Sequence, residues 1–271
     1  MDYGGIMSKA VFSDIDGTLT YGTRPLSERT VNDINELIKK RMHFVAVSGR
    51  ACHCAAPLFK AHGLNIPIIG CSGALCQKAD GGFLWEEGFS LCEAKEVIKF
   101  TRRQFSGIVP AIYTRENWYV EDRSHPWIRR EEEVVRFNAS EFQFSSLSDG
   151  IIINKVLLIM EDEIQSELLN LLIEAFPYLR FTTTAPCFIE VMPKHVDKGF
   201  AVKKYLEAYQ IDEKNAYCFG DHMNDLEMLT AVQNSYVVAN ASDEVKRIAN
   251  FVCDSCDDDG VAKVIEEKLL K

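Results

Sequence analysis

Short apolar segments alternate with amphipathic segments near both ends of the chain, and this alternation is typical of a parallel β-sheet covered by helices. In the first part, residues 9–13, 42–47 and 66–69 are expected to be strands, with helices at 27–41 and 52–62 between them. Because these strands are largely apolar along their whole length, both faces of the sheet must be covered. The sequence therefore predicts an α/β fold with a Rossmann-like, three-layer core.

The same alternation returns near the end of the chain, after a middle part whose order is mixed. Late helices are expected at residues 199–209, 225–232, 243–249 and 261–270, and late strands at 216–219, 236–238 and 251–253. The middle part is expected to contain strands at 83–85, 108–113, 118–120, 155–160, 179–183 and 188–191, and helices at 93–105, 127–136 and 164–176. The simplest organisation is a discontinuous catalytic core, residues 7–81 and 190–271, with an inserted α+β cap domain at residues 82–189.

Composition limits the classes of partner. The chain has 271 residues, of which 47% are hydrophobic, enough for a substantial core. Its net charge of -10 argues against binding to nucleic acid or to an anionic membrane surface. No apolar run approaches the length of a membrane span, and Met1–Lys9 lacks the pattern of a signal peptide. We expect a cytoplasmic protein that binds neither nucleic acid nor membranes, and a monomer by default because the cap is internal.

The nine cysteines are an odd number spread over a long chain, which favours reduced thiols. Two clusters are candidate metal sites, Cys52-His53-Cys54 and Cys253-Asp254-Ser255-Cys256. A zinc site with four ligands needs a second pair at suitable spacing, and neither cluster has one. We interpret Cys52 and Cys54 as small apolar residues at a helix start, and a redox role for Cys253 and Cys256 stays open.

The strongest chemical signal is Asp14-Ile15-Asp16-Gly17-Thr18-Leu19, which closes the first apolar strand. On an extended backbone, Asp14 and Asp16 project to the same side, and two close carboxylates repel unless a cation neutralises them. One ionised Asp can attack phosphorus, while a neighbouring Asp can give and take a proton. The alternative is an acidic Asp-Gly turn after a core strand.

Two further segments offer groups that can hold a phosphate. Ser48-Gly49-Arg50 ends the second core strand, where ligands gather in open α/β sheets. Its hydroxyl and backbone N–H groups can donate to phosphate oxygens. Lys198-Gly199 opens the helix after the insert, so its ammonium could reach the carboxylates and a phosphate. Taken singly, each could instead be a common turn or a solvated helix start.

Gly220-Asp221-His222-Met223-Asn224-Asp225 follows another apolar strand and opens a helix. Asp221, Asn224 and Asp225 share one face of its first turn, and helix capping alone does not require all three. With Asp14 and Asp16, these carboxylates make an oxygen-rich site of the kind that Mg²⁺ prefers. His222 is interpreted as a bystander.

The four motifs, in this order, resemble those of the haloacid dehalogenase-like (HAD) phosphatases. They are D-I-D-G-T-L at Asp14–Leu19, S-G-R at Ser48–Arg50, K-G at Lys198-Gly199 and G-D-x-x-N-D at Gly220–Asp225. The large insert between the second and third motifs resembles the Cof-type branch with a type IIB cap. The resemblance continues through residues 238–241 and 258–262 and so covers nearly the whole chain.

The resemblance implies a role for each motif residue. Asp14 would be the nucleophile and a Mg²⁺ ligand, and Asp16 the general acid and base that also binds Mg²⁺ through its backbone carbonyl. Ser48, Gly49 and Lys198 would hold the phosphoryl group. Asp221 would bind Mg²⁺, Asp225 would support the metal's ligands, and Asn224 would contact phosphate or help to order those ligands.

Two departures from the family pattern concern substrate placement. Ser72, in Cys71-Ser72-Gly73-Ala74, stands where the family often has Asn, and His195 stands where a small residue is common. Candidates for substrate contacts in the cap are Trp118, Arg123, His125, Trp127 and Arg129. The alternative for these five is that the aromatics pack inside the cap and the arginines face solvent.

The sequence thus predicts a Mg²⁺-dependent phosphatase that hydrolyses small phosphorylated metabolites, such as sugar phosphates, through an aspartyl-phosphate. One alternative is a phosphomutase on the same core, which returns the phosphoryl group to a second hydroxyl instead of to water. Another is a phosphometabolite-binding protein without turnover. The intact pair Asp14 and Asp16 disfavours the latter, because binding needs no nucleophile.

Overall fold

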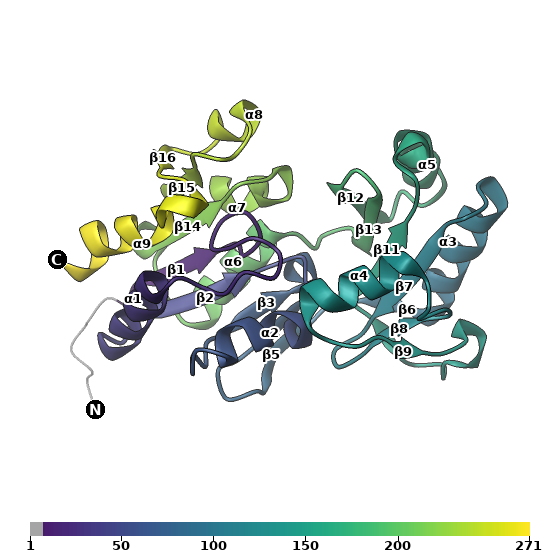
Figure 1. The fold of residues 1–271 in the computed structure, drawn as a ribbon, viewed down its shortest axis with the longest axis horizontal. Helices are drawn as coiled ribbons and strands as arrows, with labels where there is room; N and C mark the ends of the chain where they lie inside the picture. The colour runs from purple at the N-terminus through teal and green to yellow at the C-terminus, as the bar shows by residue number, and fades with distance from the viewer. Residues whose placement is uncertain (1–7) are drawn as a thin grey trace.

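The computed structural model describes residues 8–271 (Figure 1). Met7, where the predicted core begins, lies outside the described part. The same is true of residues 1–7 of the segment Met1–Lys9, in which no signal peptide is predicted. Among the residues described, no helix is both long and apolar enough to span a bilayer.

The larger of the sheets has eight strands in the order β16-β15-β14-β1-β2-β3-β4-β5. The strands are β1 (Ala10–Ser13), β2 (His43–Val47), β3 (Ile68–Gly70), β4 (Leu75–Gln77), β5 (Phe83–Glu86), β14 (Ala216–Gly220), β15 (Asn234–Val238) and β16 (Phe251–Cys253). Neighbours from β16 to β3 pair in parallel, and β4 and β5 add an antiparallel edge. The parallel order reverses direction at β1, and a ligand-binding crevice is expected at such a point.

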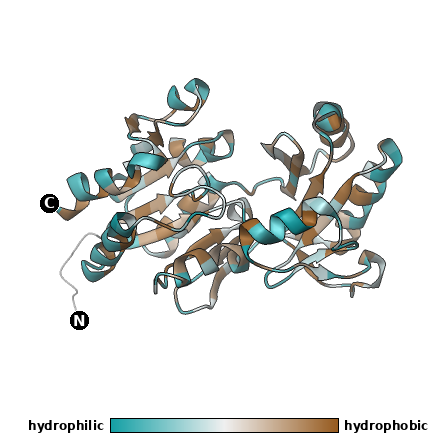
Figure 2. Ribbon diagram, viewed as in Figure 1, coloured by the Kyte–Doolittle hydropathy of each residue, from teal (hydrophilic) through white to brown (hydrophobic). Residues whose placement is uncertain are grey.

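Helices cover both faces of this sheet. They are α1 (Glu28–Lys39), α2 (Cys52–Lys60), α6 (Lys198–Ala208), α7 (Leu226–Thr230), α8 (Asp243–Lys246) and α9 (Gly260–Ile265). Along β1, Val11 packs with α1, α2 and α9, whereas Ala10 and Phe12 pack with α6 and α7. Figure 2 shows the strands as hydrophobic ribbons between more hydrophilic helices. The predicted three-layer α/β core is confirmed.

Helix α1 begins where the sequence predicts and ends two residues early. The Ser27 hydroxyl accepts a hydrogen bond from the Thr30 backbone N–H, at 3.1 Å, and so caps the first turn. The predicted end was Arg41, but Arg41 has a φ of 60°. This left-handed conformation cannot continue a right-handed helix, so α1 stops at Lys39.

A second, six-stranded sheet has the order β12-β13-β11-β7-β8-β9. Its strands are β7 (Val109–Tyr113), β8 (Trp118–Val120), β9 (Ser140–Glu141), β11 (Lys155–Ile159), β12 (Leu179–Ala185) and β13 (Phe188–Pro193), and β6 (Phe89–Ser90) pairs separately with β10 (Ile152–Ile153). Helices α3 (Leu91–Gln104) and α5 (Asp162–Ala175) pack on one face, and α4 (Pro126–Val135) packs with residues of the other.

The strand pairing places both boundaries between the core and the insert at other residues than those predicted. Residues 83–86, predicted to lie in the insert, form β5 and pair with β4, a strand that the sequence did not predict. Residues 190–193, predicted to lie in the core, belong to β13 of the small sheet. The Trp85 indole donates to the Gly73 carbonyl at 3.0 Å, which helps to hold β5 on the large sheet. The division into a core and a cap stays a prediction, with its boundaries moved accordingly.

Candidate active site

A cavity of about 260 Å³ lies at the carboxyl ends of β1, β2 and β14. The six-stranded sheet and α4 form its other wall. Of the residues predicted from the motifs, those that line the cavity are Asp14, Asp16, Ser48, Gly49, Asp221 and Asn224. Lys198 and Asp225 are fully buried beside the cavity. Lys198 contacts both Asp14 and Asp225. The structure therefore brings all eight predicted residues into one region.

Lys198 connects two of the buried carboxylates. Its ammonium donates to Asp14 Oδ1 at 2.6 Å and to Asp225 Oδ1 at 2.5 Å. Burial alone would lower the pKa of Lys198, but the charges of Asp14 and Asp225 raise it above its ordinary value. Lys198 is therefore a permanent cation whose position is fixed by two carboxylates.

The carboxyl group of Asp14 is buried among other carboxyl groups. Burial raises its pKa well above the ordinary value, Lys198 opposes this shift, and Asp225, Asp221 and Asp16 raise it further. The backbone N–H of Asp14 donates to the Phe219 carbonyl at 3.0 Å, which joins the ends of β1 and β14. One lysine does not offset several carboxylates, so a bound cation would stabilise the ionised form of Asp14.

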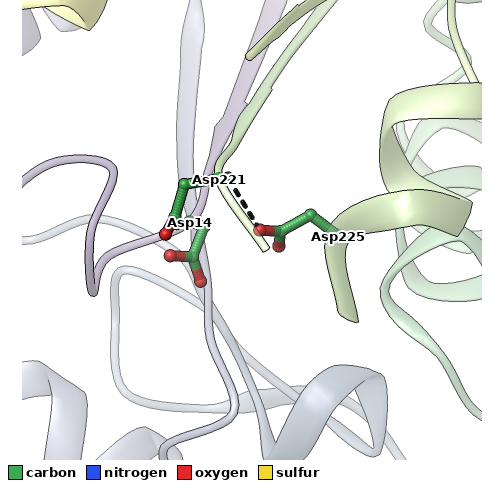
Figure 3. Close-up of side chains that lie close together, drawn as sticks. All are labelled: Asp14, Asp221 and Asp225. Carbon is green, nitrogen blue, oxygen red and sulfur yellow. Dashed lines mark hydrogen bonds between the residues drawn. The ribbon is translucent and has the colours of Figure 1, made fainter. Parts of the chain in front are cut away.

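Asp14, Asp221 and Asp225 form the acidic cluster shown in Figure 3. One oxygen from each lies within 4.8 Å of the others. Asp225 Oδ2 accepts the backbone N–H groups of Asp221 and His222, both at 3.0 Å, and its Oδ1 accepts Lys198. Both oxygens of Asp225 are thus engaged, which leaves Asp14 and Asp221 better placed to bind a cation directly. Neither cysteine cluster belongs to this group.

The carboxylate oxygens of this cluster suit Mg²⁺, which prefers hard oxygen ligands and keeps several waters. Burial, together with the charge of Asp225, raises the pKa of Asp221 to about 6. Below that pH a proton competes with a metal ion for Asp221. The residues present therefore fit the predicted ion, with Asp14 and Asp221 as ligands and Asp225 as their support.

The turn after β1 is fitted closely against Asp221. The Thr18 hydroxyl donates to Asp221 Oδ1 at 2.7 Å, and Asn240 donates to the Gly17 carbonyl at 2.8 Å. Gly17 has a φ of +92°, and a Cβ at this position would lie 2.3 Å from Asp221 Oδ2. Only glycine meets both conditions without strain.

Gly17→Ala is expected to lower the free energy of unfolding by about 1–3 kcal/mol, because it combines backbone strain with a clash against Asp221. It should also weaken Mg²⁺ binding, since Asp221 must move. Urea unfolding and calorimetric titration with Mg²⁺ measure the two effects. The matched control is Gly22→Ala in the same loop, where φ is +52° but no described atom lies within 4 Å of the new Cβ. Equal Mg²⁺ affinity in both variants would contradict the role given to Gly17.

The carboxylate of Asp16 is held by Arg50 and lies outside the acidic cluster. Arg50 donates through Nε to Asp16 Oδ2 at 2.7 Å and through Nη2 to Oδ1 at 2.5 Å. Arg50 also donates to the carbonyls of Gly22, at 3.3 Å, and Val134 in α4, at 3.5 Å. The predicted Mg²⁺ contact through the Asp16 carbonyl stays a prediction. No role beyond membership of its motif was predicted for Arg50.

A buried cluster that the sequence did not predict joins the small sheet to the turn after β2. Lys155 in β11 donates to Glu190 Oε1 and to the Gly49 carbonyl, both at 2.7 Å. Ser72 donates to Glu190 Oε2 at 3.0 Å. Ser72 has a φ of 52°, a conformation that Asn, often found here in the family, adopts readily. The signal in the sequence that could have indicated this cluster is a charged residue within each of two apolar strands, Lys155 in β11 and Glu190 in β13.

The five predicted cap residues do not line the cavity. Trp118 is fully buried and stacks on Tyr113, with ring centroids 5.5 Å apart, and Arg123 is paired with Glu132 at 2.5 Å. His195, the second departure from the family pattern, is exposed and lies 3.3 Å from Glu87. The alternative reading of Trp118 as a packed cap residue is the correct one.

Residues 11–265 match the model of the haloacid dehalogenase-like hydrolases. A Haemophilus influenzae relative named "Putative phosphatase" is 30% identical over 266 residues, which cover 97% of this chain and 99% of the relative. A Bacillus subtilis relative named 5-amino-6-(5-phospho-D-ribitylamino)uracil phosphatase is 25% identical over 264 residues, or 97% of this chain and 96% of the relative. The solved structure of a sugar phosphatase of HAD subclass IIB has a TM-score of 0.81 at 19% identity and covers 96% of this chain and 98% of its own. The resemblance seen in the motifs is confirmed, and the chain belongs to the haloacid dehalogenase-like hydrolase family.

Proposed function

We propose that the protein is a Mg²⁺-dependent phosphatase that hydrolyses small phosphorylated metabolites through an aspartyl-phosphate on Asp14. The observation that carries this proposal is the way in which Asp14 is held. Lys198 engages Oδ1, whereas Oδ2 has no hydrogen-bond partner among residues 8–271 and Asp14 lines the cavity. A carboxylate that lines a cavity and has one oxygen held by a fixed cation and the other unpaired is suited to attack phosphorus.

In the proposed reaction, Asp14 Oδ2 forms a bond to phosphorus as the bond to the leaving oxygen breaks. Ser48, Gly49, Lys198 and Asn224 hold the phosphoryl oxygens, as the family resemblance implies. Water then attacks the aspartyl-phosphate and releases inorganic phosphate. When bound at Asp14 and Asp221, Mg²⁺ would neutralise charge on the phosphoryl group and offset its repulsion from Asp14.

Asp16 is the proposed general acid and base. It lines the cavity, next to Asp14, and would give a proton to the leaving oxygen and take one from the attacking water. Arg50 holds both oxygens of Asp16 in the conformation described. Each of these oxygens keeps a second lone pair that can take a proton, so Arg50 orients Asp16 without blocking proton transfer.

The proposed substrates are sugar phosphates or related phosphomonoesters of the cytoplasm. The named substrate of the Bacillus subtilis relative carries its phosphate on a ribityl chain, and the HAD subclass IIB neighbour is named a sugar phosphatase. A cavity of about 260 Å³ is slightly smaller than the roughly 300–1,000 Å³ typical of ligand pockets, which favours a small ester.

A phosphomonoester panel tests the function, with phosphate release measured with Mg²⁺ and after chelation. We expect release only with Mg²⁺. Because the pKa of Asp221 is about 6, the Mg²⁺ concentration that gives half the maximal rate should increase between about pH 7.5 and about pH 5.5. The control is chelated protein to which Mg²⁺ has been added back, which should recover phosphate release. Equal release with and without chelator would show that the proposed mechanism is wrong.

A further inference from the structure

The side chains opposite Asp14 decide which leaving groups the cavity can accept. Of the cavity-lining residues contributed by α4 and the six-stranded sheet, the charged ones are Glu131, Lys155 and Glu190. Their charges do not balance, because two are acidic and one is basic. A ligand can meet only those charges that are not already paired within the protein.

Lys155 and Glu190 neutralise each other. Their charged atoms lie 2.7 Å apart, and each side chain is only 5% exposed. Lys155 also donates to the Gly49 carbonyl and lies 4.7 Å from the centre of the Tyr113 ring, while the second oxygen of Glu190 accepts from Ser72. Neither side chain has a charge to offer to a substrate.

Arg50 is occupied in the same way. Both of its bonds to Asp16 are short, and its side chain is only 10% exposed. Arg50 and Lys155 are the arginine and lysine that line the cavity, so each is already paired with a carboxylate. A second anionic group on a substrate would find no unpaired arginine or lysine there.

Glu131 differs from these paired residues. It lies on α4 one turn before Val134 and Val135, which line the same cavity. Within residues 8–271 it has no hydrogen-bond or ion-pair partner. Burial raises the pKa of Glu131, and the charges of Lys155 and Arg50 oppose this shift. Glu131 is thus an unpaired acceptor in the wall of the cavity.

We propose that Glu131 selects substrates whose leaving group presents a hydroxyl or an ammonium group and no second anionic group. The inference rests on the proposed phosphatase function. A hydroxyl or ammonium can donate to the Glu131 carboxylate, whereas a carboxylate or second phosphate would face an unpaired like charge in a partly desolvated space. Tyr113, Leu157 and Phe188 supply apolar wall for the carbon frame of such a leaving group.

Two matched pairs of esters test the proposal at about pH 8, where a carboxylate is ionised. Glycerol 3-phosphate carries a hydroxymethyl group where 3-phosphoglycerate carries a carboxylate. Phosphoethanolamine carries an aminomethyl group where phosphoglycolate carries a carboxylate. We expect the parent protein to prefer the first member of each pair by about tenfold or more in kcat/KM. In Glu131→Gln, each preference should fall by about tenfold, mainly through KM.

Two controls accompany these measurements. Glu133→Gln, on the same helix, removes an exposed charge that does not line the cavity and should leave both preferences unchanged. Glu131→Asp keeps the charge, so this variant should still prefer the first member of each pair. Equal rates within both pairs in the parent protein, or unchanged preferences in a folded Glu131→Gln, would overturn the proposal. If the parent protein releases no phosphate from any ester, including p-nitrophenyl phosphate, the phosphatase function itself fails.

Discussion

Asp14→Asn is expected to lower kcat/KM for every phosphomonoester that the parent protein hydrolyses by about four orders of magnitude or more. An amide has nearly the same shape as a carboxylate, but it is a very poor nucleophile toward phosphorus. Its oxygen can still accept the hydrogen bond that Lys198 gives to Asp14 Oδ1. The variant should therefore lose chemistry and keep its fold, as initial rates and thermal unfolding would measure.

The matched control is Asp257→Asn, which makes the same change at an exposed residue paired with Arg24. Its rate should equal that of the parent protein. Since the pKa of Asp14 is raised by burial and by nearby carboxylates, Asp14→Asn is also expected to unfold at the same temperature as the parent protein or a higher one. A folded Asp14→Asn with more than about one hundredth of the parent activity would exclude Asp14 as the nucleophile.

Lys198→Met is expected to give the largest loss of stability, about 3–5 kcal/mol in the free energy of unfolding. Methionine fills much of the same space, but Asp14 and Asp225 are then left buried without the cation that contacts both. Lys198 is only 1% exposed, so water cannot replace it without opening the core. Urea unfolding at neutral pH, without Mg²⁺, measures the loss, and phosphate release should also disappear.

Lys204→Met is the matched control on the same helix. Lys204 pairs with Glu87 but is 33% exposed, so its replacement should cost about 0–1 kcal/mol. Adding Asp14→Asn to Lys198→Met should recover part of the lost stability, because one fewer charge is left uncompensated. Equal losses for the two single lysine variants would mean that the buried ion pairs contribute little.

The core and its motifs could be predicted because their signals are local. An apolar run such as Ala10–Ser13 specifies a buried strand, and a carboxylate directly after it must lie at the strand's end. Strand β4 was missed because it has only three residues and follows Cys71 and Ser72, two non-glycine residues with positive φ. No hydrophobic period can be recognised over such a length.

The partners of the charged residues could not be predicted for a different reason. Ser72 and Glu190 are 118 residues apart in the chain, and Arg50 and Asp16 are 34 apart. A sequence pattern shows that a charge occurs in an apolar strand, but the folded arrangement of two sheets decides what it contacts. The same limit explains why the sequence left two alternatives for Trp118, a substrate contact or a packed residue, and why the structure was needed to place it in the interior.

The contacts of Lys155 and Glu190 divide the wall opposite Asp14 into fixed and changeable positions. Lys155 binds the Gly49 carbonyl in the turn that also carries Ser48, and Glu190 holds Lys155 and accepts from Ser72, so replacing either would disturb the groups that hold the phosphate. Glu131 lies on the same wall and touches none of that machinery. Over evolutionary time, a lineage could therefore acquire new substrates by substitutions on α4 and keep its phosphate chemistry intact.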